Sequence, residues 1–138
     1  MQIVLSGRPG ERESAVRLLE EFCREQRVPR AVLNAADVAL EEHLTNVISY
    51  GYDPRAPYRV VVTLKVEGDC LCMNVEDDGK PFDPLTTPPA DTSLPLEQKP
   101  IGRLGVHLMR QFMDELSYAR ESGRNVLRMR KRIEAATD

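Results

Sequence analysis

Hydrophobic residues recur at three- and four-residue spacing in two long stretches near the start of the chain. Residues 11–27 show this pattern, and so does the stretch after Val28-Pro29 as far as Tyr50. Such spacing is typical of helices that bury one face. Gly51 is well placed to end the second helix. The pattern therefore predicts two consecutive amphipathic helices.

Apolar and alternating runs predict five strands, in chain order residues 1–5, 58–66, 70–76, 116–120 and 125–132. Short glycine-containing turns separate the second strand from the third and the fourth from the fifth, so each pair is expected to form an antiparallel hairpin. A third helix is predicted over 104–115. Strands joined mainly by hairpins imply a mixed, mostly antiparallel sheet with helices on one face. The predicted fold class is an α/β two-layer sandwich.

Residues 80–101 contain six prolines and no sustained periodicity. A structureless segment of this length is uncommon inside a compact domain and is usually functional.

The bulk composition narrows the class of protein. With 138 residues, the chain is expected to form one domain over 1–138. A net charge of -3 argues against nucleic-acid binding, which needs a basic surface. Neither a membrane-spanning run nor a secretory signal is recognisable, so we expect a cytoplasmic protein. Of the three cysteines, Cys70 and Cys72 fall on one face of a predicted strand, and we expect buried or half-buried thiols.

The first stretch with candidate chemistry is LEEHLTN, residues 40–46. Glu42 and Asn46 are four residues apart, so on a helix they lie on one side, at the edge of the apolar stripe. A carboxamide oxygen there can ligate Mg²⁺ and a carboxylate can polarise a hydroxyl or water. The alternative is a pair of exposed polar side chains.

The second stretch is VEDDGKPFDP, residues 75–84, in which an apolar strand ends in two carboxylates and a glycine. Asp77 can accept a hydrogen bond from an amino group such as that of adenine, and Gly79 lets the backbone turn sharply or approach a ligand closely. The alternative is an ordinary Asp-Gly turn.

The third stretch begins the last predicted helix. Gly102 and Gly105 precede or open it, and the free N–H groups of a helix N-terminus suit phosphate. The alternative is a flexible loop followed by a packed helix.

Taken together, the three stretches resemble the nucleotide site of the GHKL ATPases, which have the Bergerat, or histidine-kinase-like ATPase, fold. The segments EEHLTNVISYGYD (41–53), VEDDGKPFDP (75–84) and IGRLGVHLMRQFMDELSYARESGRNVLRMRK (101–131) resemble more narrowly the anti-sigma-factor serine/threonine protein kinases of bacterial partner-switching modules. The resemblance covers nearly the whole chain.

The resemblance implies a role for each matching residue. Asn46 matches the asparagine that coordinates Mg²⁺ at the ATP phosphates, and Glu42 matches the acidic residue thought to act as general base. Asp77 matches the aspartate that reads the adenine amine, and Gly79 the glycine beneath the base. Thr45 and Asn125 also fall in familiar positions, the latter as a structural residue.

The remaining correspondences concern the phosphates. Residues from about 83 to 101 match the ATP lid, and Gly102 and Gly105 match the glycines that wrap the phosphates. Lys99 or Arg103 can supply positive charge there. The family usually has glycine where this chain has Arg103, which can reach a phosphate, point to solvent or stiffen the lid.

The implied function is phosphorylation of a serine or threonine on a STAS-domain antagonist, with ATP and Mg²⁺. The unphosphorylated antagonist would release a sequestered regulator, typically a sigma factor, and the family suggests a homodimer. Two alternatives remain: a nucleotide-gated binding protein with little or no kinase activity, and a histidine kinase catalytic domain. The latter is disfavoured because no dimerisation helix with a phospho-accepting histidine precedes the site. His43 is expected at the helix surface or the site edge, and His107 is expected to be structural.

Overall fold

A computed structural model describes residues 1–53, 56–86 and 103–133, with the backbone alone at 86 and 103–107. In chain order the elements are β1 (Gln2–Leu5), α1 (Glu11–Glu25), α2 (Arg30–Tyr50), β2 (Val60–Glu67), β3 (Cys70–Asp77), the short 3₁₀ helix η1 (Pro84–Thr86), α3 (Arg103–Phe112), β4 (Glu115–Glu121) and β5 (Arg124–Arg132). The five strands and three helices are those that the sequence predicts, with shifted ends.

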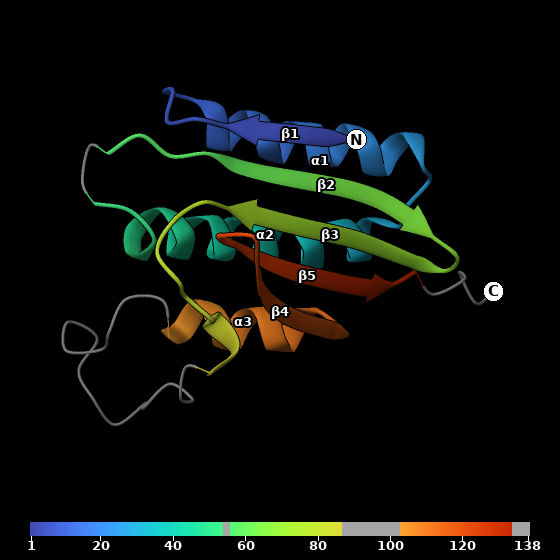
Figure 1. Ribbon diagram of the computed structural model, residues 1–138. Helices are drawn as coiled ribbons and strands as arrows, with labels where there is room; N and C mark the ends of the chain where they lie inside the picture. Colours follow the sequence, from blue (N-terminus) through green and yellow to red (C-terminus); the bar gives the residue numbers. More distant parts are fainter. Residues whose placement is uncertain (54–55, 87–102, 134–138) are drawn as a thin grey trace.

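The strands form one sheet in the order β1-β2-β3-β5-β4, and all four neighbouring pairs are antiparallel. The three α-helices lie on one side of this sheet, with α1 nearest β1 and α3 nearest β4 (Figure 1). The structure is therefore a two-layer sandwich, as predicted.

The core fills the space between the helices and the sheet. Alternate residues of β3 point into it, because successive side chains of a strand face opposite sides. Leu71, Met73 and Val75 are fully buried on this side. Asp77 continues the same alternation, so the strand aims a carboxylate at the helix layer where it ends. Opposite it in the register stands Asn125, at the start of β5.

The third helix ends earlier than the sequence indicates. It was expected to run to Glu115, but α3 stops at Phe112 and β4 begins at Glu115. The reason is pairing with β5: Asp114 N donates to Arg130 O at 2.9 Å, and Asp114 Oδ2 accepts from Arg132 N at 2.6 Å. Extended pairing replaces the last helical turn.

The three cysteines are free thiols. Cys23 and Cys72 are buried and Cys70 is half-buried, which confirms the expectation. Over the described ranges, no helix is both long and apolar enough to cross a membrane.

Candidate nucleotide site

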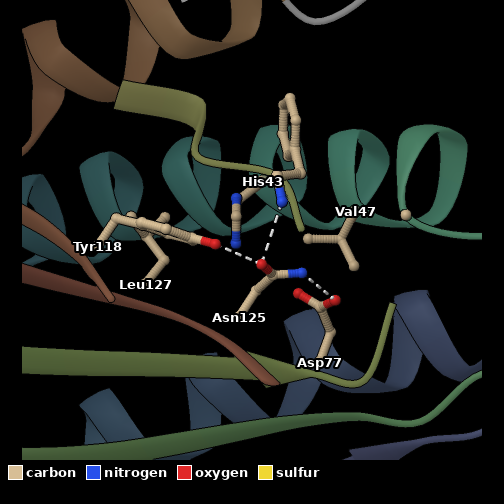
Figure 2. A pocket seen from close by; sticks show the side chains of 8 residues that line it. His43, Val47, Asp77, Tyr118, Asn125 and Leu127 are labelled. Carbon is tan, nitrogen blue, oxygen red and sulfur yellow. Dashed lines mark hydrogen bonds between the residues drawn. The ribbon is translucent and has the colours of Figure 1, made fainter. Parts of the chain in front are cut away.

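Asp77 lies at the end of β3 in the interior of the protein. Its side chain is 3% exposed. Oδ1 accepts hydrogen bonds from Gly79 N and from Asn125 Nδ2, both at 2.9 Å. Figure 2 shows this carboxylate facing Asn125 below α2. Both bonds use the same oxygen, so Oδ2 stays available to a ligand as far as the described residues are concerned.

Asn125 holds the segment that follows β3. Its Nδ2 also donates to Lys80 O at 2.8 Å. Its Oδ1 accepts from Phe82 N at 3.1 Å and from the Tyr118 hydroxyl at 2.5 Å. The amide thus makes four hydrogen bonds, which use both its donors and both lone pairs of its oxygen. Asn125 is structural, in agreement with the role that the sequence suggested.

Burial sets the electrostatics of Asp77. Removal from water raises the pKa of the carboxyl above its ordinary value, and the hydrogen bonds from Asn125 and Gly79 and the charge of Arg120 act in the opposite direction. The Arg120 Nη1 donates to Gly79 O at 2.9 Å. A cation therefore supports the turn that holds the carboxylate.

Position 79 has no room for a side chain, so it requires glycine. A Cβ placed on it would lie 2.6 Å from Gly51 O and 3.0 Å from Asp77 Oδ1. The backbone passes so close to the end of α2 that Lys80 N donates to Gly51 O at 2.9 Å. Gly51 ends α2 as predicted, in the right-handed rather than the left-handed region. Gly79 thus lets the turn after β3 pack directly on the helix end.

Glu42 and Asn46 lie one turn apart on α2. Asn46 is 1% exposed and Glu42 is half-buried, so the alternative of two exposed polar residues is wrong. The Nδ2 of Asn46 has no hydrogen-bond partner in the described part of the chain. A buried amide with an unused donor is uncommon in native proteins and indicates a missing partner.

The residues fit a magnesium ion only together with a substrate. Within the described ranges, no cluster of three or more His, Cys, Asp or Glu side chains could hold a metal. In phosphoryl-transfer sites, however, Mg²⁺ usually takes one or two protein ligands, substrate phosphates and waters. The side-chain carbonyl of Asn46 is a suitable hard ligand for such an ion.

Three residues near the site were not predicted to belong to it. The Arg12 Nη2 donates to Thr45 Oγ1 at 2.5 Å, which brings a cation of α1 beside the residue preceding Asn46. Phe82 stacks on Tyr50 with ring centroids 5.5 Å apart. Neither contact has a local sequence signal, because each joins elements far apart in the chain.

His43 corrects an expectation. It was expected at the helix surface or the site edge, but its side chain is only 3% exposed, so the surface expectation is wrong. It lines a pocket with seven other residues: Val47, Gly51, Asp77, Phe82, Tyr118, Asn125 and Leu127. The space between them is too narrow for a water molecule. Burial lowers the pKa of His43 to about 4, so the ring is neutral at physiological pH.

The phosphate side of the predicted site is described only in part. Lys99, Gly102 and most of the predicted lid over 83–101 lie outside the described residues. Arg103 is the first residue of α3 and Gly105 its third, as expected for a glycine motif that opens a helix. The structure describes only the backbone of Arg103, Gly105 and His107.

The chain matches a known protein family over most of its length. A family model for the histidine kinase-like ATPase domain matches residues 5–131. The serine/threonine-protein kinase BtrW of Bordetella bronchiseptica is 35% identical to the chain over 89 residues, which cover 63% of this chain and 61% of BtrW. The matched region thus spans less than two thirds of that relative.

Solved structures show the same fold. The RsbU and RsbW domains of a Mycobacterium tuberculosis protein give a TM-score of 0.67 at 14% identity, covering 99% of this chain and 33% of that one. The histidine kinase domain of a blue-light activated histidine kinase from Erythrobacter litoralis gives 0.51 at 21% identity, covering 76% and 49%. These likenesses confirm the histidine-kinase-like ATPase fold.

Replacing Gly79 with alanine should destabilise the protein. The added Cβ would overlap backbone Gly51 O, and overpacking of this kind costs about 1–3 kcal/mol. Urea unfolding measures the loss. Lys80→Ala in the same turn is the control, because it removes only an exposed ion pair with Asp53 and should change little. Equal stability of Gly79→Ala and wild type would contradict the close packing.

His43 should make the folded state acid-sensitive. Its pKa is lowered from 6.5 to about 4, so between these values the unfolded chain binds a proton that the folded chain does not. Stability therefore falls as pH drops below about 6.5, by about 2 kcal/mol at pH 5. Urea unfolding of wild type and His43→Leu from pH 7.5 to 5 isolates this contribution.

The comparison is needed because other groups act in the opposite direction. The pKa of Asp37 is raised to about 6, first by burial and then by Glu41. Its ionisation therefore lowers the free energy of unfolding as pH rises. This effect is the same in wild type and in His43→Leu. A stability difference between them that does not change with pH would contradict a buried, neutral His43.

Proposed function

The chain belongs to the histidine kinase-like ATPase domain family, and from this premise we propose that it is a Mg-ATP-dependent serine/threonine protein kinase. Family membership confirms the superfamily that the three motifs indicated. The kinase activity is supported by the similarity to BtrW. The observation that carries the proposal is the placement of Glu42 and Asn46 on the helix whose end packs on the turn after Asp77.

Asp77 would bind the base of ATP. Its Oδ1 is held by Gly79 N and Asn125, and its other oxygen would accept an N–H of the adenine amine. A buried carboxylate that is already oriented loses little freedom on binding, which favours affinity. Gly79 would lie beneath the base.

Asn46 and Glu42 would serve the phosphates. Asn46 would hold Mg²⁺, which when bound neutralises charge on the ATP phosphates. Gly102 and Gly105 would contact the phosphates through the backbone, and Lys99 or Arg103 would add positive charge. Phosphoryl transfer depends chiefly on such positioning and charge neutralisation.

Glu42 would act as general base. The acceptor hydroxyl oxygen bonds to the γ-phosphorus while the bond from that phosphorus to the β–γ bridging oxygen breaks, and ADP leaves with the electron pair. The hydroxyl proton passes to the Glu42 carboxylate. The half-buried position of Glu42 suits this role, because the carboxylate can meet a protein substrate arriving from solvent.

The acceptor would be a serine or threonine of a STAS-domain antagonist. Unphosphorylated antagonist would bind this kinase and release a sequestered sigma factor or other regulator, and phosphorylation would reverse the exchange. The protein would act in the cytoplasm, as a homodimer. The acceptor, the exchange and the homodimer rest on the resemblance of the three motifs to anti-sigma-factor kinases, and the cytoplasmic location rests on the sequence composition.

Replacing Glu42 with glutamine should strongly slow phosphoryl transfer while ATP still binds. Loss of a general base lowers rates by about 10²–10⁴-fold. The assay incubates the protein with labelled ATP, Mg²⁺ and the STAS-domain partner, and the label on the partner is measured. Glu41→Gln is the matched control, because Glu41 is the exposed neighbour. A wild type that binds the partner but transfers no phosphate would instead support a nucleotide-gated binding protein.

Asp77→Asn should weaken ATP binding by about tenfold or more, because a charged acceptor for the amine is lost. Isothermal titration calorimetry measures the affinity. Asp78→Asn is the control: Asp78 is exposed and its Oδ1 accepts from the Tyr52 hydroxyl outside the pocket. Unchanged affinity in Asp77→Asn would remove the adenine role.

A further inference from the structure

His43 carries a buried nitrogen with no partner. The side chain is 3% exposed, and its Nδ1 has no hydrogen bond within the described part of the chain. Buried polar atoms are nearly always hydrogen-bonded in native proteins, so an unpaired one points to a missing partner. Figure 2 shows the ring extending from α2 towards Asn125 and the Tyr118 hydroxyl.

Water is not this partner. The space that His43 lines with Asp77 and Phe82 does not admit a water molecule, and a buried water needs both room and several polar partners. A ligand group can satisfy Nδ1 if the lining side chains part to admit it.

Few polar atoms of the neighbouring side chains are still free to form hydrogen bonds with such a ligand. Asn125 has already used its two donors and its oxygen. Asp77 has used Oδ1. The neutral ring of His43 has one N–H donor and one bare nitrogen that accepts. The pocket thus offers a ligand the free oxygen of Asp77 and the unpaired Nδ1 of His43.

Resting on the proposed function, in which ATP occupies this pocket, we infer that His43 is a specificity-determining residue for the base. The neutral ring then carries its proton on Nε2, so that Nδ1 accepts one N–H of the adenine amine while Asp77 accepts the other. An amine has two N–H donors, so the two acceptors match it. A guanine carbonyl at the same place would face two acceptors and be rejected, which discriminates ATP from GTP.

Two substitutions at His43 test the acceptor. His43→Leu fills the same space without a polar atom and should weaken ATP binding about tenfold. His43→Asn places an oxygen the same number of bonds from Cβ as Nδ1 and should stay within about threefold of wild type. Titration calorimetry with ATP and with GTP measures both effects, and His43→Leu should lose part of the preference for ATP.

Deletion of the amine from the ligand locates the contact. Purine riboside triphosphate lacks the exocyclic amine, so wild type and His43→Leu should bind it equally, within about twofold. 7-Deaza-ATP keeps the amine, so the effect of His43→Leu should persist with it. In wild type, the ¹⁵N resonance of Nδ1 should shift with ATP and stay unmoved with purine riboside triphosphate.

The outcomes separate this inference from the proposed function. If wild type binds ATP and phosphorylates its partner while the Nδ1 resonance does not move, the role of His43 is overturned and the kinase assignment stands. An effect of His43→Leu that vanishes with 7-deaza-ATP also overturns it, because the contact is then to N7. If wild type binds no ATP, both fall. The resonance measurement needs only wild type, so it decides even if a variant does not fold.

Discussion

The hydrogen bond between Asn125 Nδ2 and Asp77 Oδ1 is the interaction on which the site depends. It joins the last residue of β3 to the second residue of β5, two strands that pair along their whole length. The sheet therefore fixes the distance between the two side chains. Without this bond, a buried carboxylate would lose a donor, and burial would favour its protonated form. The acceptor character of Asp77 thus follows from the antiparallel register.

The same amide also connects the sheet to the turn that covers the site. Asn125 Oδ1 accepts from Phe82 N, and Asn125 Nδ2 donates to Lys80 O. The same turn also packs on the end of α2, where Gly51 O accepts a hydrogen bond from Lys80 N. One asparagine therefore holds the turn, and the turn is joined to the end of the helix that carries Glu42 and Asn46.

Much of this could be predicted from the sequence because the signals are local. Periodicity identified each helix and strand, and the Glu42–Asn46 spacing placed both on one side of α2. The end of α3 was missed because it depends on bonds from Asp114 to β5. The surface position expected for His43 was wrong because its neighbours Tyr118 and Asn125, which help to bury it, come from distant strands. The resemblance identified Gly79, but its physical reason, the approach to Gly51 O, is visible only in three dimensions.

Two movements can open the narrow pocket that His43 and Asp77 line, and they cost different amounts of free energy. Shifting the turn of residues 79–82 would break its hydrogen bonds to Asp77, Gly51 and Asn125, each worth about 1 kcal/mol. Rotating Phe82 away would break its stacking on Tyr50, worth about 0.5–1.5 kcal/mol beyond buried area. Side-chain rotation is the cheaper route. In the proposed function, this rotation would admit the base while the turn and the end of α2 keep their places, so that Glu42 and Asn46 would stay in position for the phosphates.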